Sequence, residues 1–224
     1  DVLEVTLTAS TPTSNLLVNG SGEAGDMTGW TIDKQGGDGW KVLGSGYDEG
    51  SGSFVTSFAM CIRSQTIDLL SAGYSEEQLD AAPEIKVGEY YKGKAVKFDD
   101  TYQLKVQLLD AQKKVIKSYD TGSIKTTQDW QWAGTTFKAY GPGVRFVKFQ
   151  DQGQDSEYWK GYYGSVMDAA EVSIGGDAQW TDVRFSNDGA EWGNWMALAD
   201  SYGWKLAPGG GEKTVWVQFK NEAG

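Results

Sequence analysis

Two aromatic side chains and a lysine, Tyr158, Trp159 and Lys160, follow a polar run from Gln150 to Glu157. The C–H face of a pyranose stacks on an indole ring, and a buried sugar hydroxyl needs a fixed hydrogen-bonding partner because leaving it unpaired is costly. Flat rings beside a lysine at the edge of a loop therefore suit a sugar. The sequence predicts a carbohydrate contact at these three residues.

Carboxylates are the groups from which a glycosidase would be built, and this chain has 31 Asp and Glu residues. Asp155 with Glu157, or Asp99 with Asp100, could be named as a pair, but hydrolysis needs two carboxyl groups about 5 to 10 Å apart that flank one bond. Carboxylates that are neighbours in a polar loop give no evidence of this arrangement. We favour the interpretation that they are solvated acids on loops. The chain also lacks histidine, the commonest general base. We predict that the protein is not an enzyme.

Metal and thiol chemistry find little support in the sequence, and no cofactor is predicted. The Asp- and Gly-rich stretch from Asp26 to Asp38 has oxygen ligands but no recognised loop spacing, so a structural calcium ion stays an open alternative. The single cysteine, Cys61, lies among apolar residues and is predicted to be a small buried side chain. Trp30 and Trp40, each preceded by glycine, are predicted to pack into the core.

The composition points to a globular protein of short strands. Among 224 residues there are thirty glycines, four prolines, ten tryptophans and eleven tyrosines, which favours tight turns and strands over long helices. The net charge is −11, so nucleic acid and anionic membrane surfaces would be repelled. No apolar run is long enough for a spanning helix, and we expect no membrane insertion. The chain starts at Asp1 and stops at Gly224 in a way that predicts flanking domains of a longer protein.

Alternating apolar and polar residues predict an antiparallel sheet. Leu104, Val106 and Leu108 share one face of a strand, which is the period-2 pattern of a sheet with one wet side. Residues 144–149 have apolar side chains on both faces, so that strand is predicted to be central or bulged. One short helix is expected at Ser75–Asp80, where a serine cap precedes acidic residues. Further strands are predicted at 2–10, 54–66, 85–89, 114–119, 131–138 and 171–174.

Most of the chain resembles a known family, the F-box-associated domain, the glycan-reading half of sugar-binding F-box proteins. The resemblance covers residues 15 to 175 and implies a ten-stranded antiparallel jelly-roll β-sandwich that reads the Man3GlcNAc2 core of N-linked glycans, above all its chitobiose. The stretches that show the likeness are Asn15-Leu16-Leu17, Gly37-Asp38-Gly39-Trp40-Lys41-Val42, Thr56-Ser57-Phe58 with Cys61, Gln65-Thr66-Ile67-Asp68-Leu69, Tyr102-Gln103-Leu104 and the whole of Tyr140 to Gly164.

The resemblance also implies which residues contact the glycan. Its sugar-contacting aromatic-aromatic-lysine triplet falls on Tyr158, Trp159 and Lys160, and the phenylalanine before its cysteine falls on Phe58. The family also has a sugar-contacting aspartate in the loop before the Tyr-x-Leu strand. In an alignment without gaps Lys97 stands at this position, and a shift of the alignment is needed to reach Asp99 or Asp100. Tyr162, Tyr163 and Phe58 are alternatively core residues of the sandwich.

The tail from Val183 to Lys220 resembles the C-terminal part of a bacterial immunoglobulin-like repeat of secreted surface proteins, in which an earlier strand usually reads like Val5-Thr6-Leu7-Thr8-Ala9-Ser10. We therefore predict a sandwich at 12–175 inserted into an immunoglobulin-like domain made of 1–11 plus 176–224, since each fragment alone is too small to bury its apolar face. The predicted fold is all-β, a jelly-roll sandwich with a second, small immunoglobulin-like β domain.

The predicted function is a non-catalytic carbohydrate-binding module that recognises an N-glycan core or chitobiose, with a glycan or glycoprotein as partner. The resemblance of the tail implies an extracellular or cell-surface location. The alternative is a structural or adhesion spacer without an open sugar site, which predicts collapsed loops and buried rings around Trp159.

Overall fold

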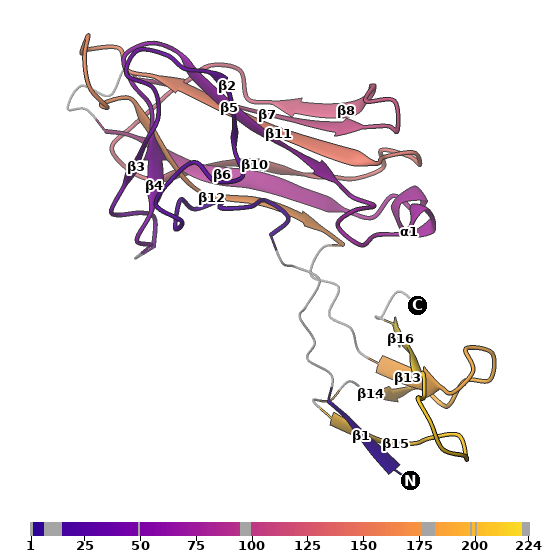
Figure 1. Ribbon diagram of the computed structural model, residues 1–224. Helices are drawn as coiled ribbons and strands as arrows, with labels where there is room; N and C mark the ends of the chain where they lie inside the picture. The colour runs from indigo at the N-terminus through magenta and orange to yellow at the C-terminus, as the bar shows by residue number, and fades with distance from the viewer. Residues whose placement is uncertain are drawn as a thin grey trace. The chain divides into compact units, whose positions relative to one another are not determined.

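The computed structural model describes residues 2–6 (backbone alone), 15–48, 50–94, 100–175, 182–197, 199 and 201–220. The chain divides into two compact units. One unit is Asn15–Gly176, and the other joins Asp1–Ser14 to Asp177–Gly224. Figure 1 shows the strands of each unit, and each is described by itself.

The larger unit is an antiparallel jelly-roll β-sandwich of two sheets (Figure 1). This confirms the predicted all-β fold. The five-stranded sheet runs in the order β10 (Gln131–Phe137), β6 (Ile85–Gly93), β12 (Ser165–Ile174), β4 (Ser53–Val55) and β3 (Lys41–Leu43). The six-stranded sheet runs in the order β2 (Thr31–Lys34), β5 (Cys61–Asp68), β11 (Phe146–Gln154), β7 (Thr101–Leu109) and β8 (Val115–Asp120), with β9 (Ile124–Lys125) paired to β7.

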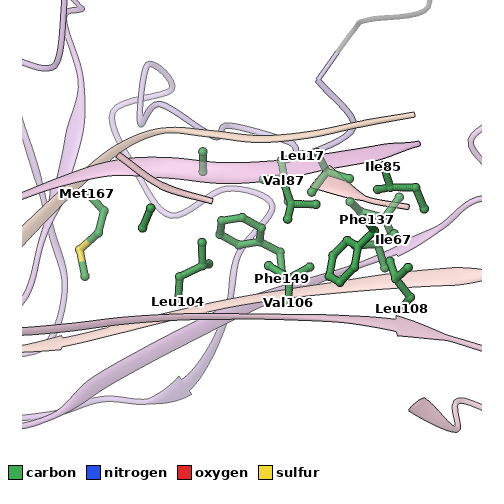
Figure 2. Packing of buried hydrophobic residues seen from close by; sticks show 14 of the residues in the cluster. Leu17, Ile67, Ile85, Val87, Leu104, Val106, Leu108, Phe137, Phe149 and Met167 are labelled. Carbon is green, nitrogen blue, oxygen red and sulfur yellow. The ribbon is translucent and has the colours of Figure 1, made fainter. Parts of the chain in front are cut away.

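The core lies between the two sheets and follows the period-2 pattern of the sequence (Figure 2). Leu104, Val106 and Leu108 of β7 are wholly buried, and Phe149 of β11 meets them from the neighbouring strand. Strand β11 pairs with β5 on one side and β7 on the other, so the prediction of a central strand is confirmed.

One strand prediction is wrong: the stretch 54–66 holds two strands, β4 and β5, which lie in different sheets. Other local predictions are met. The helix is α1 (Glu76–Asp80), with the Ser75 hydroxyl accepting from the N–H of Gln78. Trp30 and Trp40 are buried, and the buried Cys61 thiol donates to the carbonyl of Gly36 at 3.3 Å.

One boundary differs from the prediction. The polar run from Gln150 was expected to be a loop, but β11 continues through it to Gln154. The reason is that Asp151 and Gly153 point inward, Asp151 toward a buried arginine, so polar residues hold the inward positions of the alternation. The connecting turn therefore begins only at Asp155.

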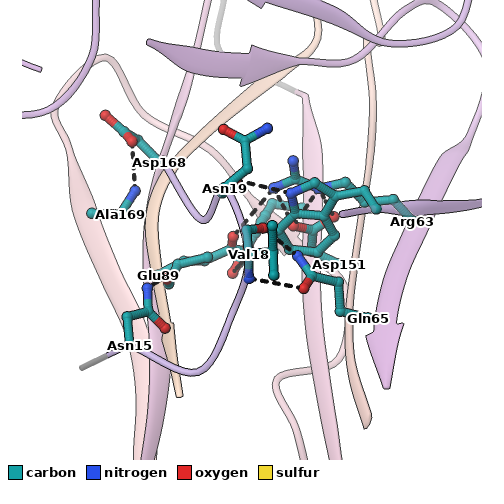
Figure 3. Close-up of polar contacts among 12 residues, drawn as sticks. Asn15, Val18, Asn19, Arg63, Gln65, Glu89, Asp151, Asp168 and Ala169 are labelled. Carbon is teal, nitrogen blue, oxygen red and sulfur yellow. Dashed lines mark hydrogen bonds and ion pairs between the residues drawn. The ribbon is translucent and has the colours of Figure 1, made fainter. Parts of the chain in front are cut away.

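A charged network lies inside the sandwich (Figure 3). The guanidinium of Arg63 donates to both carboxylate oxygens of Asp151 at 2.7 to 2.9 Å. Its second neighbour is Glu89 at 3.8 Å, and the Tyr102 hydroxyl donates to Glu89 at 2.8 Å. Burial, together with the charge of Asp151, raises the pKa of Glu89 well above its usual range. Because Glu89 belongs to one sheet and the other three residues to its partner, the network links the two sheets.

Aromatic rings close the network off from water. Arg63 is wholly buried, and its guanidinium carbon lies 3.7 Å from the centre of the Trp30 ring and 3.8 Å from that of Phe54. Rings this close to a guanidinium supply cation–π attraction where water is absent. No pattern in the sequence indicates this network.

The smaller unit holds two antiparallel sheets. Strand β1 (Val2–Thr6) pairs with β15 (Ser201–Lys205), with Val2 opposite Lys205. The other sheet has the order β14 (Met196–Ala197), β13 (Asp182–Ser186) and β16 (Trp216–Lys220). Residues 7–14 lie outside the described part, so the predicted extension of the first strand to Ser10 lies there too. The immunoglobulin-like character of this unit and the limits 12–175 and 1–11 plus 176–224 stay predictions.

No described helix combines the length and the apolar composition that crossing a bilayer requires. No group of three or more carboxylate or thiol side chains in the described ranges is arranged to hold a metal ion. Asp26, in the stretch considered for calcium, accepts the N–H of Thr28 at 2.8 Å.

Candidate functional site

The turn between β11 and β12 presents the predicted aromatic residues to solvent. Trp159 is 82% exposed, and Tyr158 and Tyr163 are each 44% exposed. Together with Lys160 and Gly161 they line a shallow pocket of about 440 Å³, which we call the Trp159 pocket. The structure thus brings Tyr158, Trp159 and Lys160 together at one opening.

Asp155 shapes the start of this turn. Its side chain is buried and accepts the N–H groups of Glu157 at 2.8 Å and Tyr158 at 3.2 Å, as aspartate does in tight turns. Its own N–H donates to the carbonyl of Ser57 at 2.9 Å. The interpretation of Asp155 as a solvated loop acid is therefore wrong, because backbone N–H groups take the place of water around its carboxylate.

Asp38 and Ser57 fasten the far side of the turn. The N–H of Gly161 donates to the Asp38 carboxylate at 2.7 Å, and the Ser57 hydroxyl donates to the carbonyl of Gly161 at 2.7 Å. The loop closes because the N–H of Asp38 donates to the same Ser57 oxygen at 2.9 Å. The hydroxyl of Tyr162 adds a bond to the Asp38 carbonyl at 3.0 Å. Two segments distant in the sequence, those of Asp38 and Ser57, thus hold the turn.

Gly161 has a φ of +91°, in the left-handed region that side chains rarely adopt. A Cβ at this position would lie 2.8 Å from the ring of Tyr163. The absence of a side chain lets that ring stay beside Tyr158, with 4.6 Å between the two ring centres. Glycine is therefore needed here for the shape of the pocket.

Lys94, the residue that follows strand β6, also supports the turn. Its ammonium donates to the carbonyl of Tyr162 at 2.9 Å and lies 5.6 Å from the centre of the Tyr163 ring. Burial, and then the charge of Lys41, lower the pKa of Lys94. The Lys41 ammonium lies 5.6 Å from the centre of the Tyr162 ring, so both lysines adjoin the turn.

The other residues expected to contact a sugar lie elsewhere. Phe58 is partly buried against Gly37 and does not line the Trp159 pocket, and Asp99 lies outside the described residues. Asp100 is wholly buried beneath the turn, where its carboxylate accepts the N–H of Ser156 at 3.2 Å. Desolvation raises the pKa of Asp100 to about 6. Asp100 thus supports the turn from below rather than facing solvent.

Sequence reasoning missed several residues that form the site. Asp38, Ser57 and Lys94 are far from the aromatic triplet in the chain, and only folding brings them to it. Asp38 and Ser57 do lie inside stretches quoted for the family likeness, which was the available signal. Tyr163, weighed above as a core residue, is instead half-exposed at the pocket.

A substitution tests the fastening of the turn. Asp38→Ala removes the acceptor of the Gly161 N–H, so we expect amide exchange at Gly161 to become about fivefold faster, the effect of one lost hydrogen bond of about 1 kcal/mol. Hydrogen exchange followed by NMR measures this. Asp33→Ala, which removes a surface bond to Gln150, is the matched control and should leave Gly161 unchanged. Equal exchange rates of the Gly161 amide in Asp38→Ala and in the parent would show that Asp38 does not hold the turn.

The two-sheet antiparallel sandwich with loops gathered at one end is a jelly-roll domain. The F-box associated region family model matches residues 9–174. The chain belongs to this family.

Curated relatives agree with this membership. The chain is 39% identical over 173 residues to F-box only protein 6 of Rattus norvegicus, covering 71% of this chain and 60% of the relative. It is 38% identical over 175 residues to F-box only protein 2 of Bos taurus, covering 71% of this chain and 58% of the relative. The chain thus spans about three fifths of the length of these two relatives.

A solved structure is similar in fold. The enzymatically active domain of tailspike protein 4 of bacteriophage CBA120 superposes with a TM-score of 0.53 at 18% identity, covering 73% of this chain and 22% of that one. At this identity the likeness concerns the fold alone.

The comparisons correct one prediction. The expected extracellular or cell-surface location is wrong, because the matched relatives are F-box only proteins, which are intracellular. The prediction came from the likeness of the tail to secreted bacterial repeats, and the family match ends at residue 174, before that tail begins. The secreted, bacterial-surface setting has no support from these relatives.

Proposed function

We propose that the sandwich is a non-catalytic carbohydrate-binding module, and that the Trp159 pocket takes the inner part of an N-glycan core or another chitobiose-containing sugar. The observation on which this depends is the exposure of Trp159, 82%, on a turn that is fixed by hydrogen bonds to Asp38 and Ser57. An indole left in water at such a turn has its apolar face open to a partner.

The proposed recognition has two parts. A pyranose face stacks on Trp159, with Tyr158 beside it as a second wall. Lys160 donates hydrogen bonds to the sugar oxygens, since an ammonium group has three donors and no acceptor. Because the turn is already held by Asp38, Ser57 and Asp155, little conformational entropy is lost on binding.

Membership of the F-box associated region family supports this proposal, as does the position of the aromatic triplet in the motif that the family uses for sugar. The contacts predicted for Phe58 and Asp99 stay predictions. A glycoprotein that displays such a glycan is the proposed partner.

The alternative function, a spacer without an open sugar site, predicts buried rings around Trp159. The exposure of Trp159, Tyr158 and Tyr163 favours binding instead. A glycosidase would need paired carboxyl groups at the pocket, and no carboxylate is among the residues that line it.

Replacing Trp159, on which the sugar is proposed to stack, tests the proposal. Trp159→Ala should weaken the binding of chitobiose about thirtyfold, corresponding to about 2 kcal/mol for a binding hot spot. The affinity is measured by NMR titration of the 224-residue chain, following indole N–H signals.

The matched control is Trp216→Ala, which removes another exposed tryptophan, one that belongs to the smaller unit. It should leave the affinity unchanged. A parent chain that gives no response to chitobiose or to an N-glycan core, or a Trp159→Ala variant that binds like the parent, would rule the function out.

The domain organisation belongs to the same proposal. We propose that the binding unit is inserted within the smaller β unit, with limits at 12–175 and at 1–11 plus 176–224. The pairing of β1 with β15 supports this, because it joins the two ends of the chain in one sheet.

A further inference from the structure

A second pocket lies on the outer face of the five-stranded sheet, and the proposed function does not use it. Its volume is about 380 Å³, within the range of about 300 to 1,000 Å³ typical of small-molecule sites. We call it the Trp130 pocket. Its lining residues are Leu43, Ser45, Gly46, Ser53, Lys92, Gly93, Lys94, Gln128, Trp130 and Val166.

Strand register explains how these residues meet. Lys41 of β3 pairs with Val55 of β4, Val55 with Val166 of β12, and Val166 with Lys92 of β6. Residues paired in this way share one face of a sheet, with strands about 4.8 Å apart. The outer face therefore has a row with a lysine at each end and two valines between them.

The charge of the Trp130 pocket is opposite to that of the whole protein. Lys92 and Lys94 are the charged members of its lining, and no carboxylate is among them, although the chain has a net charge of −11. The Asp168 carboxylate on β12 is buried and accepts the N–H groups of Tyr47 and Ala169 instead. An anion in this pocket would meet the side chains of Lys92 and Lys94, which come from one stretch of chain.

A bound anion would stabilise the charged form of these lysines. Lys94 lies close enough to Lys41 for the charge of Lys41 to lower its pKa, after the larger effect of burial. A bound anion reduces that repulsion and replaces lost hydration. Lys92 lies 4.6 Å from the centre of the Trp130 ring, so one wall combines a ring with an ammonium group.

An aromatic cluster fixes this wall. Tyr47 stacks on Tyr90 with 3.6 Å between the ring centres, and Trp130 meets Tyr47 edge-on at 6.0 Å. Packed rings of this kind hold Trp130 in place without a ligand. The pocket therefore has one pre-formed ring and two lysines, and Ser45, Ser53 and Gln128 are also in its lining. The Ser53 hydroxyl donates to the carbonyl of Ser45 at 2.6 Å.

We propose that the Trp130 pocket binds a sugar residue that has an anionic group, with the ring of the sugar against Trp130 and the anionic group between Lys92 and Lys94. Because Lys94 also contacts the turn of the Trp159 pocket, the two pockets lie on either side of one side chain. The second pocket is independent of the first in its chemistry, since it selects negative charge.

Glucuronic acid is the probe for the test, and glucose is its neutral match. We expect glucuronic acid to shift the NMR signals of the Trp130 indole and of Lys92 when it is titrated into the 224-residue chain. The affinity for glucose should be at least tenfold lower. Lys92→Gln and Trp130→Ala should each weaken glucuronic acid binding about tenfold or more. Trp159→Ala should not change it.

Two further ligands identify the chemistry that is recognised. Glucose 6-sulfate should also bind if the anionic group rather than the carboxylate is recognised, and failure to bind would restrict the ligand to a uronic acid. Inorganic phosphate that binds as well as glucuronic acid would overturn the proposal, because the sugar ring would then contribute nothing. Equal binding of glucose and glucuronic acid, or unchanged binding in Lys92→Gln, would overturn it as well.

The outcome is separable from the function of the Trp159 pocket. Chitobiose is neutral, and its binding is expected to depend on Trp159 and not on Lys92. Loss of glucuronic acid binding in Trp159→Ala, with binding kept in Trp130→Ala, would place the acidic sugar in the first pocket and refute the second.

Discussion

Arg63→Leu is expected to lower the free energy of unfolding of the sandwich by about 3 to 5 kcal/mol. The substitution leaves the Asp151 carboxylate buried between the sheets without the guanidinium that now donates to both of its oxygens. A buried charge without a partner is far more costly than a lost surface contact. Urea denaturation followed by circular dichroism measures the change.

Two comparison variants show whether charge or packing is responsible. Arg63→Leu combined with Asp151→Leu should recover part of the loss, because an apolar pair leaves no unpaired charge. Lys105→Leu removes a lysine from a surface pair with Asp120 and should change stability by less than about 1 kcal/mol. A double variant that is as unstable as the sum of its two single variants would contradict the role of the charge.

Phe149→Ala is the second substitution with a large expected effect, a loss of about 3 to 5 kcal/mol. Phe149 is wholly buried in the central strand β11 and meets Trp30 edge-on, with 6.0 Å between ring centres. Truncation removes apolar contacts and leaves a cavity that the two sheets close only in part. The measurement is again the free energy of unfolding in urea.

The control for Phe149 lies three residues earlier in the same strand. Phe146 is partly exposed, with the Lys113 ammonium 3.8 Å from its ring centre, so Phe146→Ala should lose at most about 1 kcal/mol. If Phe149→Ala does not fold, Phe149→Leu should fold and lose less, because it keeps most of the volume. Equal losses for Phe146→Ala and Phe149→Ala would show that the assignment of core and outer faces is wrong.

The fold could be predicted from the sequence wherever one face of a strand is apolar and the other polar. Strand β7 is the clearest case, since Leu104, Val106 and Leu108 alternate with polar residues. Strand β11 shows the limit of this reasoning. Its second half has Asp151 and Gly153 facing inward, so a hydrophobic pattern stops while the strand goes on. Only the position of Arg63 on the adjacent strand explains why a carboxylate is stable there.

The site was predictable only at its exposed tip. The aromatic triplet is contiguous in the chain and matches a family motif, so Tyr158, Trp159 and Lys160 could be named. The groups that hold the turn, Asp38 and Ser57, act through long-range hydrogen bonds that local sequence does not encode. The Trp130 pocket was missed for a similar reason, since its row of residues comes from four strands far apart in the sequence.

The two ends of the sandwich lie side by side. The side-chain amide of Asn15 donates to the carbonyl of Ala170 at 2.6 Å, and its oxygen accepts the N–H of Val172 at 3.0 Å. The N–H of Leu16 donates to the carbonyl of Val172 at 2.8 Å. A unit whose entry and exit meet in this way can be placed in a surface loop without pulling the flanking strands apart. The sandwich therefore has the geometry of a domain that tolerates insertion into another chain, and the side chain of Asn15 holds its first and last residues together.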